Sequence, residues 1–169
     1  MVADLPISQG FSSDICVIRA AEHYGLPPDL MFAVRAVERG KPNSAVANKD
    51  GTHDFNEPGL NTRTLRELGP KGWDVYRLSY DGCYAMYAAS YWMRKKLVEA
   101  ASKPGSLLSK AARYHSATPS FNTAYQRRLA PFLANWGCYL HVYWKYDAQS
   151  LFVIQSGVLK SEDLLQCKR

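Results

Sequence analysis

Helical spacing of apolar residues runs through most of this chain, and one long polar segment interrupts it. Residues 41–60 are rich in Asn, Asp, Gly and Pro, whereas apolar residues recur three and four positions apart on both sides of them. An irregular segment of that length inside a compact domain usually carries a function. The pattern predicts a mainly α fold with a long irregular loop or short β element, in which a strand or hairpin lies around Asp50 and Gly51.

Two helices are expected before this segment. The first runs from Asp14 to Gly25, and the second begins at Pro28, a residue type that suits a first helical turn, and stops at Gly40. The apolar positions at helical spacing are Ile15, Ile18 and Ala21 in the first helix, and Leu30, Ala33, Val34 and Val37 in the second.

Further helices are expected after the polar segment. Thr62 is a candidate cap for a short helix, and Asp81 for the longest helix of the chain. Ser106 begins another helix that ends near Tyr114, and the last clear helix covers residues 123–135. The residues expected to face inward from the longest helix are Cys83, Met86, Ala89, Trp92, Met93 and Leu97.

The helical pattern divides the chain into three parts. Residues 1–13 are expected to be an extended lead-in, residues 14–135 the folded domain, and residues 136–169 an aromatic-rich C-terminal extension. The spacing in the extension does not distinguish helix from strand, so its structure stays open. A chain of 169 residues, 47% of them hydrophobic, is long enough for one domain with a tail and a real core.

Charge narrows the class of partners. The formal net charge is +6, and Lys and Arg are spread along the chain without a long basic block. Such a surface attracts polyanions in general, including the acidic cell wall, or serves only to keep the protein in solution. We expect no nucleic-acid partner, because the sequence lacks the basic cluster or stripe of a nucleic-acid footprint.

No stretch of the sequence is long and apolar enough to predict a transmembrane segment. Residues 1–6 lack the charged start and apolar middle of a signal peptide. A periplasmic location would therefore make this chain a processed form.

The cysteines Cys16, Cys83, Cys138 and Cys167 are far apart in the sequence. None forms a Cys-x-x-Cys pair or stands at a metal-site spacing from a histidine, so we expect no metal and no cofactor. An even number of separated cysteines fits two disulfides in an oxidising compartment, with three pairings open. The alternative is four unpaired thiols in a cytosolic protein.

Glu38 is a carboxylate at the end of an apolar helix face, directly after Val37 and just before Gly40. Burial and the negative end of the helix dipole both disfavour the charged form and raise the pKa. A carboxylic acid that stays protonated near neutral pH can give a proton to the leaving oxygen of a glycosidic bond. The alternative is an ordinary exposed glutamate at a frayed helix end.

The order of motifs around Glu38 gives a second argument. An Ala-Ala-x-x-Tyr-Gly helix, a Pro-Pro-x-Leu helix entry and Glu38 come first, and the later motifs are residues 50–54, Asn61, the helix start at Cys83, Tyr114-His115-Ser116 and Tyr125. In this order the chain resembles lytic transglycosylases with a goose-type lysozyme-like (SLT) domain. The likeness is strongest to small specialised members associated with type IV pili, conjugation and secretion systems. It spans about residues 14–133, and it implies a lysozyme-like catalytic domain over residues 14–135.

Two positions depart from the family pattern. Arg39 follows the acid where the family has Ser, and Gly59 replaces the Gln that lines the sugar groove in the family, whereas Asn61 is retained. An altered glycan preference or a weakened enzyme would follow from these changes.

The resemblance implies a reaction without water. Glu38 would protonate the oxygen between N-acetylmuramic acid and N-acetylglucosamine, and would then take a proton from the muramoyl 6-hydroxyl as that hydroxyl closes a 1,6-anhydro ring. The family needs no second carboxylate. A hydrolytic muramidase would use a second one at about 5 Å or about 6.5–9.5 Å, for which Asp50, Asp54 and Glu57 are the candidates.

The resemblance also assigns substrate-binding roles. Tyr114 and Tyr125 would line the groove near Glu38, Asn61 would bind an acetamido group, and Ser116 and Gly59 would lie along the sugar strand. Judged by residue type alone, either tyrosine fits a core position equally well, and Asn61 also fits a helix N-cap.

The resemblance also implies a disulfide pairing and a cellular location. Cys16 and Cys83 both match family positions, so they are paired with each other, which leaves Cys138 for Cys167. The implied location is the periplasm, and the implied partners are peptidoglycan glycan strands and components of a pilus or secretion machine. A non-catalytic peptidoglycan-binding assembly protein of the same fold is the other alternative.

Overall fold

The computed structural model describes residues 12–167, and in this range the protein is mainly helical with one small antiparallel sheet. Most of the expected lead-in, residues 1–11, lies outside the described residues. The elements of the first half of the chain are α1 (Asp14–His23), α2 (Pro28–Glu38), β1 (Ala45–Ala47), β2 (His53–Phe55), β3 (Leu60–Asn61), α3 (Thr62–Leu68), η2 (Gly69–Lys71) and α4 (Val75–Tyr80). The later elements are α5 (Gly82–Ala100), α6 (Leu107–Ala111), η3 (Ala112–Tyr114), α7 (Pro119–Tyr143), η4 (Ala148–Ser150), α8 (Phe152–Gln155) and α9 (Ser161–Leu164).

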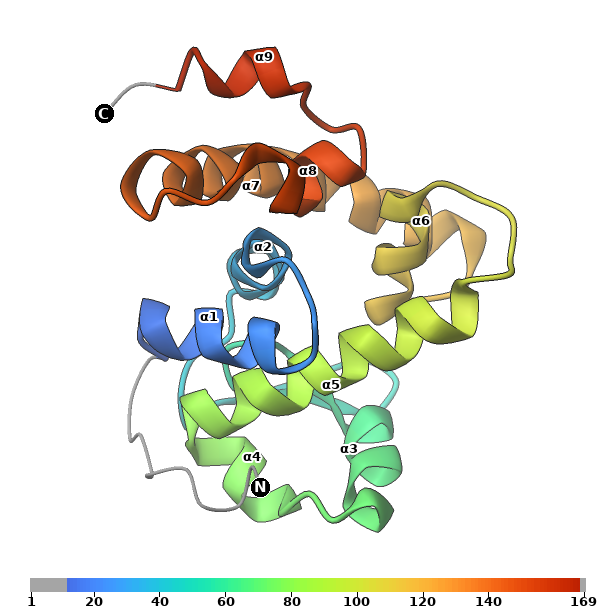
Figure 1. Cartoon of the computed structure of the whole chain (residues 1–169). Helices are drawn as coiled ribbons and strands as arrows, with labels where there is room; N and C mark the ends of the chain where they lie inside the picture. The colour runs from blue at the N-terminus through green and yellow to red at the C-terminus, as the bar shows by residue number, and fades with distance from the viewer. Residues whose placement is uncertain (1–11, 168–169) are drawn as a thin grey trace.

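Helix α2 is the centre of the fold. It packs against α1, α7 and α8, and Figure 1 shows it end-on between α1 and the long α7. Its residues 28–34 and Val37 are buried, and they include all four positions of the predicted apolar face. Phe32 stacks on Trp136 of α7 with ring centroids 4.5 Å apart, so the two helices share one core.

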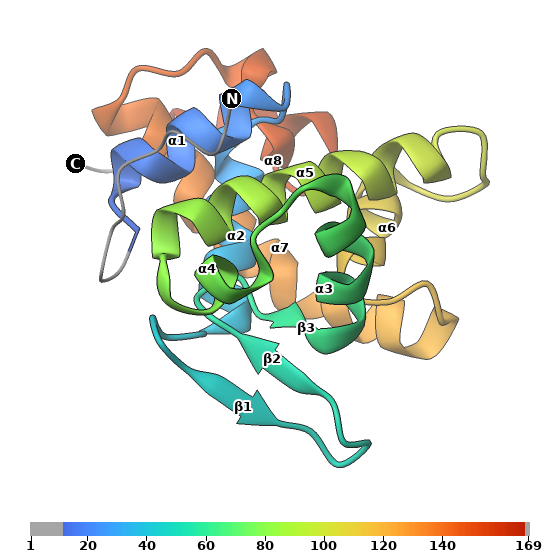
Figure 2. The same ribbon diagram turned by 90° about the horizontal axis from the view of Figure 1, so that it is seen from below.

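The polar segment forms the expected hairpin. Strands β1 and β2 pair antiparallel with Val46 opposite Asp54, and β3 adds to the other edge of β2 with Asn61 opposite Asp54. Gly51 adopts a positive φ of 79° in the turn, where glycine carries no steric penalty. Figure 2 shows the sheet at one end of the molecule, below the helices and next to α3.

Three details of the helices differ from the expectations. Ile15 is 52% exposed, and the buried face of α1 is carried by its neighbours Cys16, Val17, Ile18, Ala20 and Ala21. Asn61, not Thr62, caps α3, because its side-chain oxygen accepts the backbone N–H of Arg63 at 3.0 Å. Helix α4, capped by Asp74, lies in a stretch where no helix was expected.

The longest helix is α7 with 25 residues, not α5 with 19. It begins at Pro119 and continues through the expected domain boundary at residue 136. The crowded aromatic residues after Trp136 obscured the helical spacing, whereas Gly137 and Leu140 continue the buried face of the helix. In the inward face expected of α5, Cys83 and Leu97 are only partly buried.

The C-terminal extension is helical and packs on the core. Asp29 of α2 is fully buried and accepts the backbone N–H groups of Phe152 at 2.9 Å and Val153 at 2.8 Å. These bonds satisfy two amides at the start of α8, which have no partner inside the helix. The extension is therefore tied to the central helix.

Both disulfides form as the resemblance implies. Cys16 pairs with Cys83 and Cys138 pairs with Cys167, with Cα atoms 5.8 Å and 5.5 Å apart. Two disulfides are compatible with an oxidising compartment outside the cytosol. No helix in residues 12–167 has the length and apolar character needed to cross a membrane.

Candidate functional site

A cavity of about 750 Å³ opens where the C-terminal end of α2 meets the hairpin, α3, α5 and the segment between η3 and α7. This volume is in the range of small-molecule sites. Of the residues singled out from the sequence, the cavity brings together Glu38, Gly59, Asn61, Tyr114 and Ser116. Tyr125 does not line it; the side chain is fully buried behind the wall.

Glu38 is the last residue of α2 and reaches the cavity wall. Its pKa is raised from 4.5 to about 7 as the net result of burial and the nearby Asp54 carboxylate, which raise it, and of Tyr125 and Arg128, which lower it. Burial is the largest of these effects. A group with this pKa can both give and accept a proton near neutral pH.

The loop between β2 and β3 presses directly against this carboxyl group. A Cβ atom at Gly59 would lie 2.8 Å from Glu38 Oε2 and 3.2 Å from Glu38 Cβ, so only glycine allows the backbone to come this close. Gly59 also has a φ of +59°, which other residues rarely adopt. Gly59 therefore packs directly against the acid.

Two contacts hold that loop in place. Gly40, two residues after the acid, packs against the Asn56 carbonyl so closely that any side chain at position 40 would collide with it. Tyr114 donates its buried hydroxyl to the Pro58 carbonyl at 2.7 Å. Because this hydroxyl is already used, Tyr114 offers the cavity its ring, and it fixes the loop beside Glu38.

Tyr125 lies behind Glu38 and interacts with it through its hydroxyl. Within the described residues, neither Glu38 Oε1 nor Tyr125 Oη has a hydrogen-bond partner at standard geometry, although the phenol is close enough to lower the pKa of the carboxyl. The His115 ring stacks on Tyr125 with centroids 4.8 Å apart, and burial lowers the pKa of His115. The Arg128 guanidinium carbon lies 5.3 Å from the centre of the Tyr125 ring.

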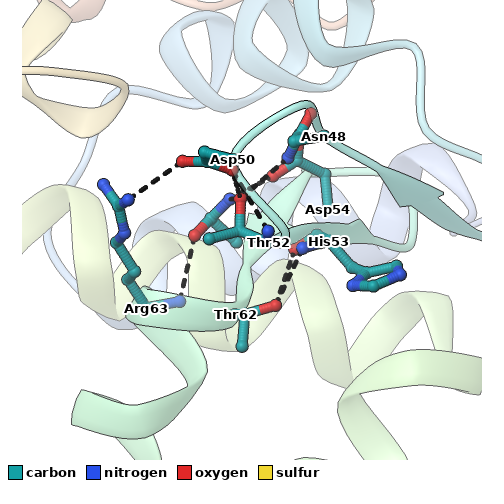
Figure 3. A network of polar contacts seen from close by, with 8 residues as sticks. Asn48, Asp50, Thr52, His53, Asp54, Thr62 and Arg63 are labelled. Carbon is teal, nitrogen blue, oxygen red and sulfur yellow. Dashed lines mark hydrogen bonds and ion pairs between the residues drawn. The ribbon is translucent and has the colours of Figure 1, made fainter.

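A second carboxylate, Asp54, lines the same cavity and is held in a polar network (Figure 3). Its two oxygens accept the side-chain amides of Asn48 at 3.0 Å and Asn61 at 2.8 Å. Thr52 joins the network through its hydroxyl, which receives Asn61 Nδ2 at 3.0 Å and donates to Asp50 at 2.7 Å. Asp54 is therefore fixed in orientation, and its charge acts on Glu38.

Asn61 has little capacity left for a sugar. Its amide nitrogen donates to Asp54 and Thr52, and its oxygen caps α3 by accepting the Arg63 amide. The N-cap alternative is the one that the structure shows, and Asn61 acts on the cavity by orienting Asp54 and not through a free amide.

The other two carboxylate candidates are placed differently. Asp50 lines the cavity rim, where it forms an ion pair with Arg63 at 2.9 Å. Glu57 is buried away from the cavity and accepts the Ser12 backbone amide at 2.6 Å. Glu57 therefore serves to anchor the start of the described chain.

Sequence reasoning missed Phe121 and Arg113, which also line the cavity. Phe121 is 61% exposed in the first turn of α7, and a large exposed aromatic ring in a groove is a suitable stacking surface for a sugar. The available signal was an isolated aromatic residue in an otherwise polar turn. Ser116 is partly buried and accepts the Thr118 amide at 3.1 Å, so its hydroxyl has a structural use in the turn.

Comparison with protein-family models, with curated proteins and with solved structures finds no match for this chain.

Proposed function

We propose that this protein is a peptidoglycan lytic transglycosylase with a lysozyme-like fold. The observation that carries the proposal is the placement of Glu38, a largely buried acid whose pKa is raised to about 7, on the wall of a cavity of about 750 Å³. An acid with this pKa is suited to protonating a leaving oxygen and then accepting a proton in the same reaction.

In the proposed reaction, Glu38 gives its proton to the oxygen between N-acetylmuramic acid and N-acetylglucosamine, and the bond from that oxygen to muramoyl C1 breaks. The substrate acetamido group stabilises the positive charge that develops at C1. The muramoyl 6-hydroxyl then bonds to C1 and returns its proton to Glu38. The products are a 1,6-anhydro end and a free N-acetylglucosamine hydroxyl, and the enzyme regains its starting protonation state.

The presence of Asp54 in the same cavity favours a second candidate, a hydrolytic muramidase. Asp54 is oriented by two amides and acts electrostatically on Glu38. In that reaction the carboxylate activates water or attacks C1. The two candidates differ in their products, because hydrolysis leaves a reducing muramic acid that is one water molecule heavier than the anhydro form.

Mass analysis of the soluble products from purified peptidoglycan tests both candidates. We expect anhydro ends from the wild type, no products from Glu38→Gln, and the same anhydro products at a reduced rate from Asp54→Asn. Reducing ends that disappear in Asp54→Asn would establish the muramidase. Binding to insoluble wall without any soluble product would establish the non-catalytic wall-binding protein instead.

The pH profile gives an independent test of the acid. Because Glu38 must start protonated, kcat/KM falls as the pH rises through about 7. Arg128 lowers the pKa of Glu38 and Asp54 raises it, so Arg128→Gln moves this limb to higher pH and Asp54→Asn moves it to lower pH. If kcat/KM falls at the same pH in the wild type and in both variants, a group other than Glu38 titrates.

We further propose that the protein acts in the periplasm and opens the wall locally for a pilus, conjugation or secretion apparatus. Two disulfides and a net charge of +6 support an oxidising compartment next to an acidic wall. Digestion of isolated wall after secretion to the periplasm, compared with a cytosolically produced and reduced sample, tests the location.

A further inference from the structure

A second, smaller hollow adjoins the cavity that contains Glu38. Its volume is about 310 Å³, and it lies between the C-terminal end of α5, helix α6 and the first turns of α7, which Figure 1 shows together at one end of the molecule. Arg113 and Ala117 line both hollows, so the two meet at these residues.

The two hollows differ in charge. The smaller one carries Lys103, Lys110 and Arg113, and none of the described residues that line it is acidic. The larger one carries carboxylates and cations together, namely Glu38, Asp50, Asp54, Glu67 and Glu99 beside Lys49, Arg63, Lys96 and Arg113. A negatively charged group is therefore attracted to the smaller hollow, where no carboxylate of the described lining offsets the cations.

The cations of the smaller hollow are free to bind a ligand. In the described part of the chain, the side chains of Lys103 and Arg113 make no hydrogen bond or ion pair; Lys110 donates one bond to the Ala101 carbonyl at 2.9 Å and keeps two donors. The hollow is held open by Asn122, which donates to the Ser109 and Ser116 carbonyls at 3.0 Å each and ties α6 to the start of α7.

We propose that the hollow lined by Lys103, Lys110 and Arg113 is a binding site for the carboxylates of the peptide stem on a glycan strand that occupies the main cavity. The inference rests on the proposed function. Neutral acetamido sugars fit the main cavity, whereas the stem peptide supplies the negative charge that the adjoining hollow attracts. The enzyme is therefore selective for peptide-bearing strands over strands without peptide.

The test compares cleavage of peptide-bearing glycan with cleavage of glycan whose peptides have been removed. The variant is Lys103→Gln with Lys110→Gln, and the matched control is Arg19→Gln with Lys71→Gln, which removes two exposed charges outside both hollows. We expect the first variant to lose about tenfold in kcat/KM on peptide-bearing strands and nothing on peptide-free strands. The control pair should behave as the wild type on both substrates.

A binding measurement separates failure of this inference from failure of the proposed function. A synthetic acidic stem tetrapeptide is titrated into the wild type and the variant by calorimetry, beside the same peptide with its carboxylates converted to carboxamides. If the wild type cleaves no glycan, the proposed function fails and this titration decides the inference: acid-selective binding that the variant loses supports it, and equal binding of the carboxamide overturns it.

If the wild type does cleave glycan, the ratio of the two substrates decides. Equal rates on peptide-bearing and peptide-free strands overturn the inference while the proposed function stands. A variant that keeps the wild-type preference for peptide-bearing strands also overturns the inference while the proposed function stands.

Discussion

At the scale of single residues, Glu38 is held by groups that act on its pKa in opposite directions. Burial and Asp54 raise the pKa, Tyr125 and Arg128 lower it, and burial dominates to give about 7. A charged carboxylate at this position is therefore unfavourable for the fold, although the proposed reaction needs it. The effect of burial on Glu38 can therefore be tested by the pH dependence of protein stability, without any substrate.

Glu38→Gln should stabilise the protein at alkaline pH. The folded state binds the Glu38 proton more tightly than the unfolded state, so the free energy of unfolding of the wild type falls as the pH rises from about 4.5 to about 7. The variant lacks this loss, so its free energy of unfolding should exceed that of the wild type by up to about 3 kcal/mol at pH 8 and equal it at pH 4. Urea unfolding at the two pH values measures the gap, and Glu162→Gln on the surface is the control. A variant that is less stable at pH 8 would show that the carboxylate is well accommodated.

Gly59→Ala should disturb the acid without unfolding the protein. The new methyl group would lie 2.8 Å from Glu38 Oε2, and the left-handed backbone adds about 1 kcal/mol of strain. Gly25→Ala is the matched control, because Gly25 has a similar φ of +63° and open space around its Cβ position. Both variants should lose similar amounts of stability from the backbone strain, whereas only Gly59→Ala should also lose activity on peptidoglycan or shift its pH profile. Equal activity in the two variants would mean that the loop yields easily.

At the scale of secondary-structure elements, residues with strong local backbone preferences predicted where helices end and where the chain turns. Pro28 and Gly40 bracket α2, and Asp50 and Gly51 lie in the turn of the hairpin, because proline and glycine restrict the backbone wherever they occur. The cap of α3 was displaced to Asn61, since Asn and Thr are both good N-caps and only the sheet register decides between them.

Tertiary packing decided the elements that the sequence did not predict. Helix α7 continues to Tyr143 because Gly137 and Leu140 pack on the core, which no short window of sequence reveals among so many aromatic residues. The site follows the same rule. Glu38 was predicted from its place on an apolar helix, whereas the role of Tyr125 as a buried support and the exposure of Phe121 depend on how α7 crosses the molecule.

The two disulfides should contribute unequally to stability. Cys16–Cys83 links residues 67 apart and Cys138–Cys167 links residues 29 apart. In the chain-entropy description the longer loop stabilises by up to about 4 kcal/mol, and the shorter loop by about 0.7 kcal/mol less. Guanidinium unfolding of the two double alanine variants measures both, and the larger drop in free energy should follow the loss of Cys16–Cys83. A larger loss from the shorter loop would show that the C-terminal segment depends on its disulfide for packing.

At the scale of the whole molecule, the same helix serves the core and the site. Helix α2 carries Asp29 near its start, bonded to the C-terminal extension, and Glu38 at its end, on the cavity. Because the helix is packed along most of its length, the position of the acid depends on both α1 and α7. The extension thus stabilises the element that presents Glu38.

Removal of residues 145–169 should therefore unfold the protein and not merely shorten it. The truncation strips four buried apolar side chains from the core, and at about 1.5–3 kcal/mol each their loss approaches the total stability of an ordinary domain. These side chains are Leu151, Phe152, Val153 and Leu164. It also leaves the Asp29 carboxyl, whose pKa is raised to about 6 by burial, without the two amides that it accepts.

Thermal unfolding followed by circular dichroism measures the effect, with Asp29→Ala in the full chain as the milder comparison. That substitution leaves the Phe152 and Val153 amides buried without an acceptor, at about 1–3 kcal/mol each, yet it keeps the apolar contacts. The expected order of melting temperatures is wild type, then Asp29→Ala, with no cooperative transition in the truncated chain. A truncated protein that melts cooperatively near the wild-type temperature would mean that the chain folds without residues 145–169, and that Glu38 is positioned without the extension.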